Sequence, residues 1–256
     1  MKNLYLPFVA VLMVIALPSQ AQRGLKLGAF GIPQISAMYN MDDASLDEDL
    51  YTMEPYVGMA GGLEVGYNFN EYIGVRLNTI FSQEGGRYSF KRTIEERTMV
   101  TTRLNYFKLP LMIGFNSFNY QGTKYSFMIY AGVSANFLTG AETYNDDPSL
   151  DIAVPESFKS FPTTKETYAP IYYSAVVDLG YQIVLGEQEK VSLIFALRGE
   201  MGLTDSEDKD ETFFIYQNGS VDEIEYWDTV GGPSRNAVTN AINIGLRVGV
   251  LYSFGD

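Results

Sequence analysis

The chain has 256 residues with 31 acidic and 18 basic side chains, a formal net charge of −13, and neither cysteine nor histidine. This composition excludes disulfides, zinc fingers and every catalytic site built on a thiol or an imidazole, and the acidity argues against nucleic acid as a partner, because phosphates are met by a basic surface. The 24 glycines together with 19 Tyr and 16 Phe favour aromatic-rich strands over helices.

The first predicted element is an export signal at residues 1–21. Lys2 precedes an apolar stretch from Leu4 to Leu17, and small residues stand at Ser19 and Ala21, the −3 and −1 positions of a cleavage site. The apolar stretch is shorter than the roughly 20 residues that a membrane-spanning helix needs. We therefore predict a signal peptide that is cleaved after Ala21, followed by a single domain over residues 22–256.

Eight segments of the remaining chain alternate apolar and polar residues with a period of two, the pattern of strands with one apolar face. The first segment is the least regular, because Phe30, Ile32 and Pro33 disturb its alternation. The eight predicted strands are Gly24–Tyr39, Val57–Phe69, Ile73–Ser82, Phe107–Phe115, Tyr125–Phe137, Ile171–Leu185, Val191–Thr204 and Ile242–Phe254.

Short and long connections alternate along the chain. The short ones are Asn68–Glu71, Ser117–Thr123 and Gly186–Glu189, and the long ones are Asn40–Pro55, Gln83–Met99, Gly140–Pro170 and Asp205–Thr239. This asymmetry is typical of outer-membrane barrels. We predict an all-β fold: an eight-stranded antiparallel up-and-down transmembrane β-barrel with short periplasmic turns and long extracellular loops, in contact with outer-membrane lipid and lipopolysaccharide.

A soluble β-sandwich or a lipocalin-like barrel is the competing fold, since both alternate in the same way. Their outward face would carry many charged residues. The polar face of this chain is mostly Gly, Ser, Ala and Asn, and small residues of this kind fit a narrow lumen.

One of these strands also carries a family resemblance. The stretch Leu104–Phe115, LNYFKLPLMIGF, resembles the signature of the PorT-like outer-membrane β-barrel family of Bacteroidota. Phe81–Tyr88 is similar to that family's strand end and glycine turn, and Leu246–Phe254 to its closing strand. The resemblance implies an outer-membrane location. Lys108 departs from the family, which often has an acidic residue at this place.

An eight-stranded barrel is narrow enough for side chains to fill its interior. In a hairpin, residues at equal distances from the turn lie opposite each other. Counting outward from the first and third short turns therefore predicts that Glu64 lies opposite Arg76 and Asp178 opposite Arg198. These pairs indicate a structural network of buried charges; a charged, gated conduction path is the alternative. The alternation places eight charged residues inside: Lys26, Glu64, Arg76, Lys108, Asp178, Arg198, Glu200 and Arg247.

Residues Thr212–Trp227 read as a hairpin on an Asn218–Gly219 turn, because Asn-Gly accepts the positive φ of a type I′ turn. Two further barrel strands are the alternative. Acidic tips at Asp42–Asp49 and Asp205–Glu211 carry the oxygen ligands that Ca²⁺ prefers, but in neither do they follow the spacing of a calcium loop. The hairpin also supplies a candidate partner surface of Phe213, Phe214, Tyr216, Tyr226 and Trp227.

These features predict no catalytic, cofactor-binding or metal-binding residue. Without histidine, most enzyme chemistry known in such barrels has no general base. We expect a barrel with a filled lumen that acts as a structural or interaction component at the cell surface, or as an accessory subunit of a larger outer-membrane complex that contacts other outer-membrane proteins through its loops. A narrow channel or a small-ligand-binding, porin-like barrel is the alternative.

Overall fold

The structure is a computed structural model that describes residues 24–39, 51–70, 72–91, 97–117, 124–145, 168–186, 190–206, 213–217, 220–224 and 238–254. Within these ranges no helix is long and apolar enough to cross a membrane. The strands are β1 (Gly24–Tyr39), β2 (Tyr51–Asn68), β3 (Ile73–Lys91), β4 (Arg97–Asn116), β5 (Tyr125–Asn145), β6 (Ile171–Leu185), β7 (Val191–Gly202), β8 (Phe213–Gln217), β9 (Ser220–Ile224) and β10 (Asn240–Ser253).

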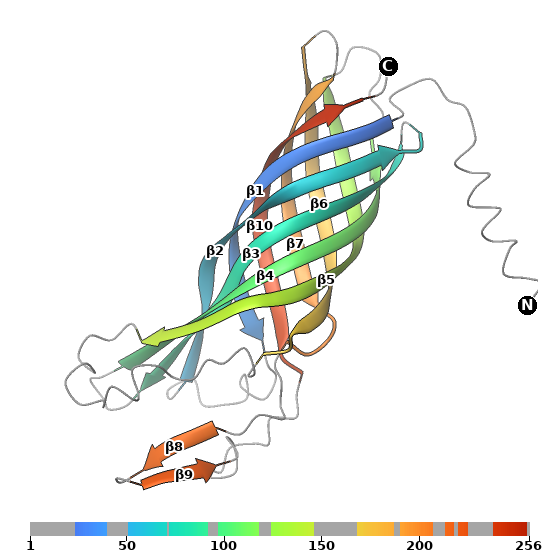
Figure 1. The fold of residues 1–256 in the computed structure, drawn as a ribbon. Helices are drawn as coiled ribbons and strands as arrows, with labels where there is room; N and C mark the ends of the chain where they lie inside the picture. Colours follow the sequence, from blue (N-terminus) through green and yellow to red (C-terminus); the bar gives the residue numbers. More distant parts are fainter. Residues whose placement is uncertain are drawn as a thin grey trace, which may run out of the picture.

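Eight of these strands close into an antiparallel barrel in the order β1-β10-β7-β6-β5-β4-β3-β2 (Figure 1). A path of paired residues that leaves β1 at Lys26 and crosses all eight strands returns to β1 at Ser36, ten residues further on. Such a stagger tilts the strands by about 40° from the barrel axis. The predicted eight-stranded up-and-down barrel is confirmed.

Four strands run further than their alternation predicts. The expected loop Gln83–Met99 is largely strand, because β3 continues to Lys91 and β4 starts at Arg97; β2 likewise begins at Tyr51 and β5 ends at Asn145. In Figure 1 these strands continue past the barrel wall. Beyond the apolar band of the outer wall, outward side chains need not be apolar. The alternation of apolar and polar residues therefore stops there, while the backbone pairing of the strands continues.

The barrel has two different ends, here called the turn end and the loop end. At the turn end, Asn70 Oδ1 accepts the backbone N–H groups of Tyr72 and Ile73 at 2.8 and 2.7 Å and closes the β2–β3 connection. After β6 the chain turns at Gly186, whose φ of 75° favours glycine. The loop end carries the long connections between β1 and β2, β5 and β6, and β7 and β10, together with the short one of residues 92–96 between β3 and β4.

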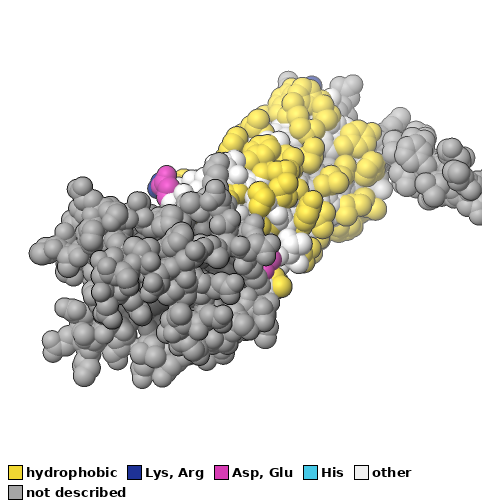
Figure 2. All heavy atoms as spheres, turned by 60° about the horizontal axis from the view of Figure 1, so that its bottom comes forward, with side chains coloured by type: hydrophobic (Ala, Val, Ile, Leu, Met, Phe, Trp, Pro, Cys, Tyr) yellow, Lys and Arg dark blue, Asp and Glu magenta, His cyan; other side chains and the backbone are white. Residues whose placement is uncertain are grey.

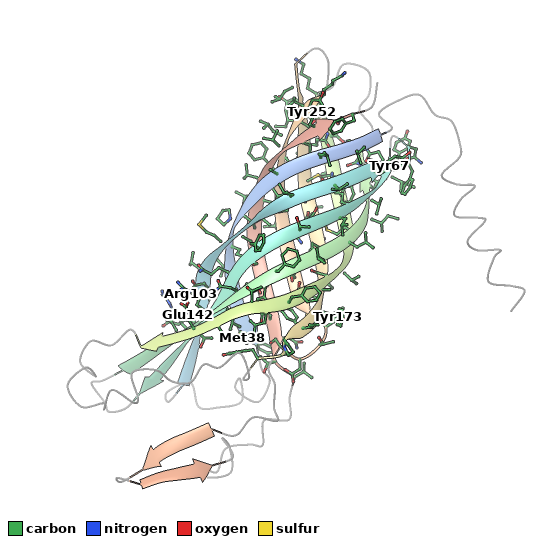
Figure 3. All side chains as sticks on the ribbon, in the orientation of Figure 1. Met38, Tyr67, Arg103, Glu142, Tyr173 and Tyr252 are labelled. Atoms are coloured by element: carbon green, nitrogen blue, oxygen red, sulfur yellow. The ribbon has the colours of Figure 1, made fainter. Side chains whose placement is uncertain are left out.

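The outer wall of the barrel is apolar. Val57 is 73 % exposed and Met59 70 %, and Figure 2 shows hydrophobic side chains covering this wall, with charged ones only at its margins. Aromatic pairs gather at the turn end, where Figure 3 labels Tyr67 and Tyr252. They are Tyr67–Phe69, Tyr72–Phe115 and Tyr252–Phe254; Phe118 and Tyr120 lie outside the described residues.

Large side chains occupy much of the interior, and glycines stand at other inward positions. The first strand corrects the sequence interpretation, because its alternation is unbroken: Phe30 and Ile32 point inward and are buried, while Pro33 points outward. Glycine makes room for them, since a Cβ added at Gly245 would lie 2.5 Å from Ile32 Cγ2. Other large buried side chains are Met38, Tyr106, Met112, Met128, Tyr130 and Tyr172.

The hairpin predicted at Thr212–Trp227 is present as β8 and β9. They pair from Phe213 opposite Ile224 to Gln217 opposite Ser220, which leaves the Asn218–Gly219 connection of two residues. The two strands form a separate sheet and are not part of the barrel (Figure 1). The ten-stranded alternative is therefore wrong.

Candidate functional site

All eight charged residues expected in the lumen are buried there. The strands bring them in from the whole circumference, because each occupies an inward position of the alternation. None of the eight is more than 7 % exposed. They lie on β1 (Lys26), β2 (Glu64), β3 (Arg76), β4 (Lys108), β6 (Asp178), β7 (Arg198, Glu200) and β10 (Arg247).

Arg247 is the centre of the charged interior. Its Nη1 donates to Asp178 Oδ2 at 2.6 Å, and its Nη2 donates to Glu64 Oε2. All three side chains are fully buried. The guanidinium also lies 4.1 Å from the ring centre of Phe30, a favourable cation–π contact. One side chain thus ties β10 to β2 on one side and to β6 on the other.

Each acidic partner of Arg247 has a second arginine. Arg198 Nη1 lies 3.3 Å from Asp178 Oδ1, and Arg76 Nε lies 3.4 Å from Glu64 Oε1. The Arg76 guanidinium in turn covers the ring of Tyr130 at 3.6 Å. Both acid–base pairs expected from the sequence are therefore in contact.

The registers of these two pairs differ. Asp178 lies directly opposite Arg198, as predicted. The prediction for Glu64 is wrong, because Glu64 pairs with Asn78 and Arg76 with Gly66. The first turn is centred one residue later than expected, since Asn70 caps its amides. This moves each partner by two residues, which keeps it on the same face, so Arg76 and Glu64 still meet diagonally.

A second group lies toward the loop end around Lys108. Its Nζ donates to Glu200 Oε1 at 2.7 Å and forms an ion pair with Glu84. Ser174 Oγ donates to the same Glu200 oxygen at 2.7 Å. The Tyr172 hydroxyl donates to Glu84 Oε2 at 3.2 Å, and Ser82 Oγ donates to Glu84 Oε1 at 2.6 Å.

Glu84 is the buried charge that sequence reasoning missed. It falls in the segment expected to be the loop Gln83–Met99, yet it is 2 % exposed and faces the lumen from β3. Glu84 lies eight residues after Arg76 on the same strand, and an even spacing places both on the same face. Continuing the alternation this far along the strand could have identified it.

The two groups join into one series, here called the charge ladder. Arg198 and Glu200 attract each other from successive inward positions of β7 and link the groups. Charges alternate strictly along the ladder, four acidic and four basic: Glu84, Lys108, Glu200, Arg198, Asp178, Arg247, Glu64 and Arg76. Lys26 is an additional cation beside its end, attracted by Glu64 and repelled by Arg76.

Chemically, the ladder is a self-neutralising interior. A buried charge is tolerated when it is paired and hydrogen-bonded, and here each acid has at least one basic neighbour. Aromatic and thioether side chains fill the space between the charges, as Tyr130 and Met128 do around Arg76. Its contacts reach across the lumen, from β4 to β7 and from β10 to β2 and β6.

Other predicted sites have less structural definition. Among the described residues no group of three acidic, His or Cys side chains could hold a metal ion. The acidic tip Asp42–Asp49 and most of Asp205–Glu211 lie outside the described residues. Of the candidate partner surface, Phe213, Phe214 and Tyr216 belong to β8, with side chains outside the description, and Tyr226 and Trp227 lie outside it altogether.

Comparison with known proteins gives a family. The model of the "Outer membrane protein beta-barrel domain" family matches residues 20–208, which leaves the closing strand β10 beyond the match. No curated protein matches the chain.

Among solved structures, the outer membrane protein OprG of Pseudomonas aeruginosa is 9 % identical, with a TM-score of 0.44, and the match covers 93 % of this chain and 99 % of that one. Neisserial surface protein A is 12 % identical, with a TM-score of 0.43 and coverage of 90 % and 97 %. Ail of Yersinia pestis is 11 % identical, with a TM-score of 0.38 and coverage of 90 % and 99 %.

Proposed function

Because this chain belongs to the outer membrane protein beta-barrel domain family, we propose that it is a closed barrel that anchors an interaction surface in the outer membrane. Its location in the outer membrane follows from the family. The further assignments are that the lumen does not conduct, that the barrel has no catalytic activity, and that it belongs to the PorT-like branch of such proteins.

The observation that carries this proposal is the charge ladder across the lumen. Arg247 links β10 to both β2 and β6 through fully buried carboxylates. An open path for hydrated ions would have to separate such pairs, and breaking one buried pair costs about 3–5 kcal/mol. A barrel of eight strands has no space to bypass them. The ladder therefore supports a lumen closed by its own side chains, here called the plug.

The interaction role rests on the asymmetry between the barrel's ends. The connection at residues 205–239 has nine acidic and two basic residues, and residues 40–50 have five acidic and no basic ones. Both connections leave from the loop end, which in outer-membrane barrels faces the exterior. Charge of one sign steers partners of the opposite sign. We infer that the loops engage other outer-membrane proteins that present basic surfaces.

Conductance tests the closed lumen. Purified, refolded protein inserted in planar bilayers should give no stable current steps of porin size, while a porin added to the same bilayer provides the positive control. Folding is checked by the heat-dependent gel mobility of the same preparation. Reproducible openings by the wild-type protein would refute the plug and favour the narrow, ligand-selective channel.

A further inference from the structure

The basic residues outside the lumen are unevenly distributed. Five of the 18 in the chain fall between positions 87 and 103: Arg87, Lys91, Arg92, Arg97 and Arg103. In the register of β3 and β4, Lys91 lies opposite Arg97, Arg87 opposite Thr101 and Arg103 opposite Gly85. Arg87 and Lys91 are four residues apart on β3, and Arg97 and Arg103 are six apart on β4, so the register places these four positions on one face of the β3–β4 pair. Of these five residues, Arg87 and Arg103 have described side chains, and both point outward.

This face belongs to the outer wall of the barrel. Arg103 forms an ion pair with Glu142 of β5, and Figure 3 shows both side chains on the outside, where the strands leave the barrel. The Arg103 side chain remains 34 % exposed. The Nε atoms of Arg87 and Arg103 are buried, so an external anion would meet the exposed part of the Arg103 guanidinium. Since a guanidinium has five N–H donors, Arg103 can accept a further anionic partner beside Glu142.

Side-chain chemistry changes in a fixed order along these strands toward the loop end. The apolar rings of Phe81 and Phe107 face each other at 5.3 Å. The next outward pair is Gln83 opposite Asn105, and beyond it lie Arg103 and Arg87. Apolar, amide and guanidinium groups thus follow one another, in the order in which a membrane lipid presents acyl chains, polar linkages and phosphate groups.

A hollow in the wall lies at the middle step of this order. It is lined by Met59, Phe81, Ser82, Gln83, Asn105, Tyr106 and Thr139. Two irregularities of register lie beside it, one in β2 between Pro55 and Ala60 and one in β5 at Thr139, where Asn105 pairs with Gly140 and Tyr106 with Leu138. The hollow lies beside Gln83 and Asn105, between the apolar rings and the arginines, so it could receive the polar groups that link a lipid's acyl chains to its phosphates.

We propose that these residues form a lipid site, the rim site, made of Gln83, Arg87, Arg103 and Asn105. The site binds the phosphate groups of a phosphorylated lipid of the outer leaflet, while the acyl chains lie along Phe81 and Phe107. Arginine suits this role because its planar donors match phosphate oxygens. The inference rests on the proposed orientation, in which the loop end faces the exterior.

Binding of lipid A to the refolded full-length protein, followed by native mass spectrometry of detergent-released complexes, tests the rim site. Wild type should bind phosphorylated lipid A, and R87Q/R103Q should bind it about tenfold more weakly, because two charge-assisted contacts are lost. Lipid A without its phosphates should bind wild type as weakly as the phosphorylated form binds the variant. Inorganic phosphate at equal concentration should not displace the lipid, which separates a lipid site from a site for free phosphate.

Two further variants make the result specific. K124Q/K190Q removes the same charge at the turn end and should bind like wild type. E142Q frees Arg103 from its ion pair and should bind about two- to fivefold more tightly, a gain that misfolding cannot produce. Equal binding by wild type and R87Q/R103Q, or equal binding of dephosphorylated lipid A, would overturn the proposal. Conductance tests the lumen without lipid A, so the plug and the rim site can fail independently.

Discussion

The ion pairs inside the barrel and the pair on its rim have the same chemistry in opposite surroundings. Arg247, Glu64 and Asp178 are completely enclosed, whereas Arg103 and Glu142 are 34 % and 58 % exposed. Water solvates the rim pair and leaves it worth little. Inside the barrel these side chains are enclosed, so each charge depends on its neighbour. Burial therefore decides how much an ion pair matters for stability here.

The two regions also differ in what they connect. The rim pair joins β4 to its neighbour β5, which the backbone already pairs. The charge ladder reaches across the lumen, since Lys108 of β4 meets Glu200 of β7, and Arg247 of β10 meets Glu64 of β2. Contacts between non-adjacent strands hold the cross-section of the barrel closed. We expect the interior pairs to set the stability of the barrel and, as proposed above, to close its lumen.

The largest effect is expected from Arg247→Met. The substitution leaves Glu64 and Asp178 each with a single, longer contact, to Arg76 and Arg198 respectively. The free energy of unfolding, measured by urea titration in detergent micelles with heat-dependent gel mobility, should fall by about 3–5 kcal/mol. Lys124→Met, at the exposed turn end, is the control and should change it by less than about 0.5 kcal/mol. A loss below about 1 kcal/mol for Arg247→Met would mean that water reaches the ladder.

An intermediate effect is expected from the pair Asp178 and Arg198. Asp178→Asn removes the partner of both Arg198 and Arg247, whereas Arg198→Met leaves Asp178 its shorter contact with Arg247. The aspartate variant should therefore be the less stable of the two. In the double variant the losses should fall short of additivity by about 1–2 kcal/mol, as for residues in contact.

This comparison of single and double variants, a double-mutant cycle, has a control: Asp178→Asn combined with Glu142→Gln. These residues belong to different regions, so their effects should add within about 0.5 kcal/mol. If Asp178 and Arg198 were also additive, they would not stabilise each other, and the interior pairs would resemble the rim pair.

The smallest effect is expected on the rim. Glu142→Gln and Arg103→Gln should each lower the free energy of unfolding by about 0.5 kcal/mol or less, and 0.5 M salt should weaken even this contribution. The same titration measures both. A cost comparable to that of Arg247→Met would show that the rim pair is shielded in the membrane, and would remove the contrast between the two regions.

Individual residues show how far the sequence could be interpreted. Parity along a strand was sufficient to place Arg247 and Asp178 inside, because a residue's face depends only on whether its position is odd or even. The direct partner of Glu64 could not be found in this way, since it depends on how Asn70 caps the turn. Glu84 was missed because an apolar alternation defines a strand only while its outer face meets lipid.

The sequence by itself determined the strands within the membrane, their order and the face of each side chain, because all three follow from local periodicity and connection lengths. Only the tertiary structure decided which charges meet across the lumen. Contacts such as Lys108 with Glu200 and Arg247 with Glu64 join strands that are not neighbours. Their distances depend on the closure and the ten-residue stagger of the barrel, which no single segment of the chain contains.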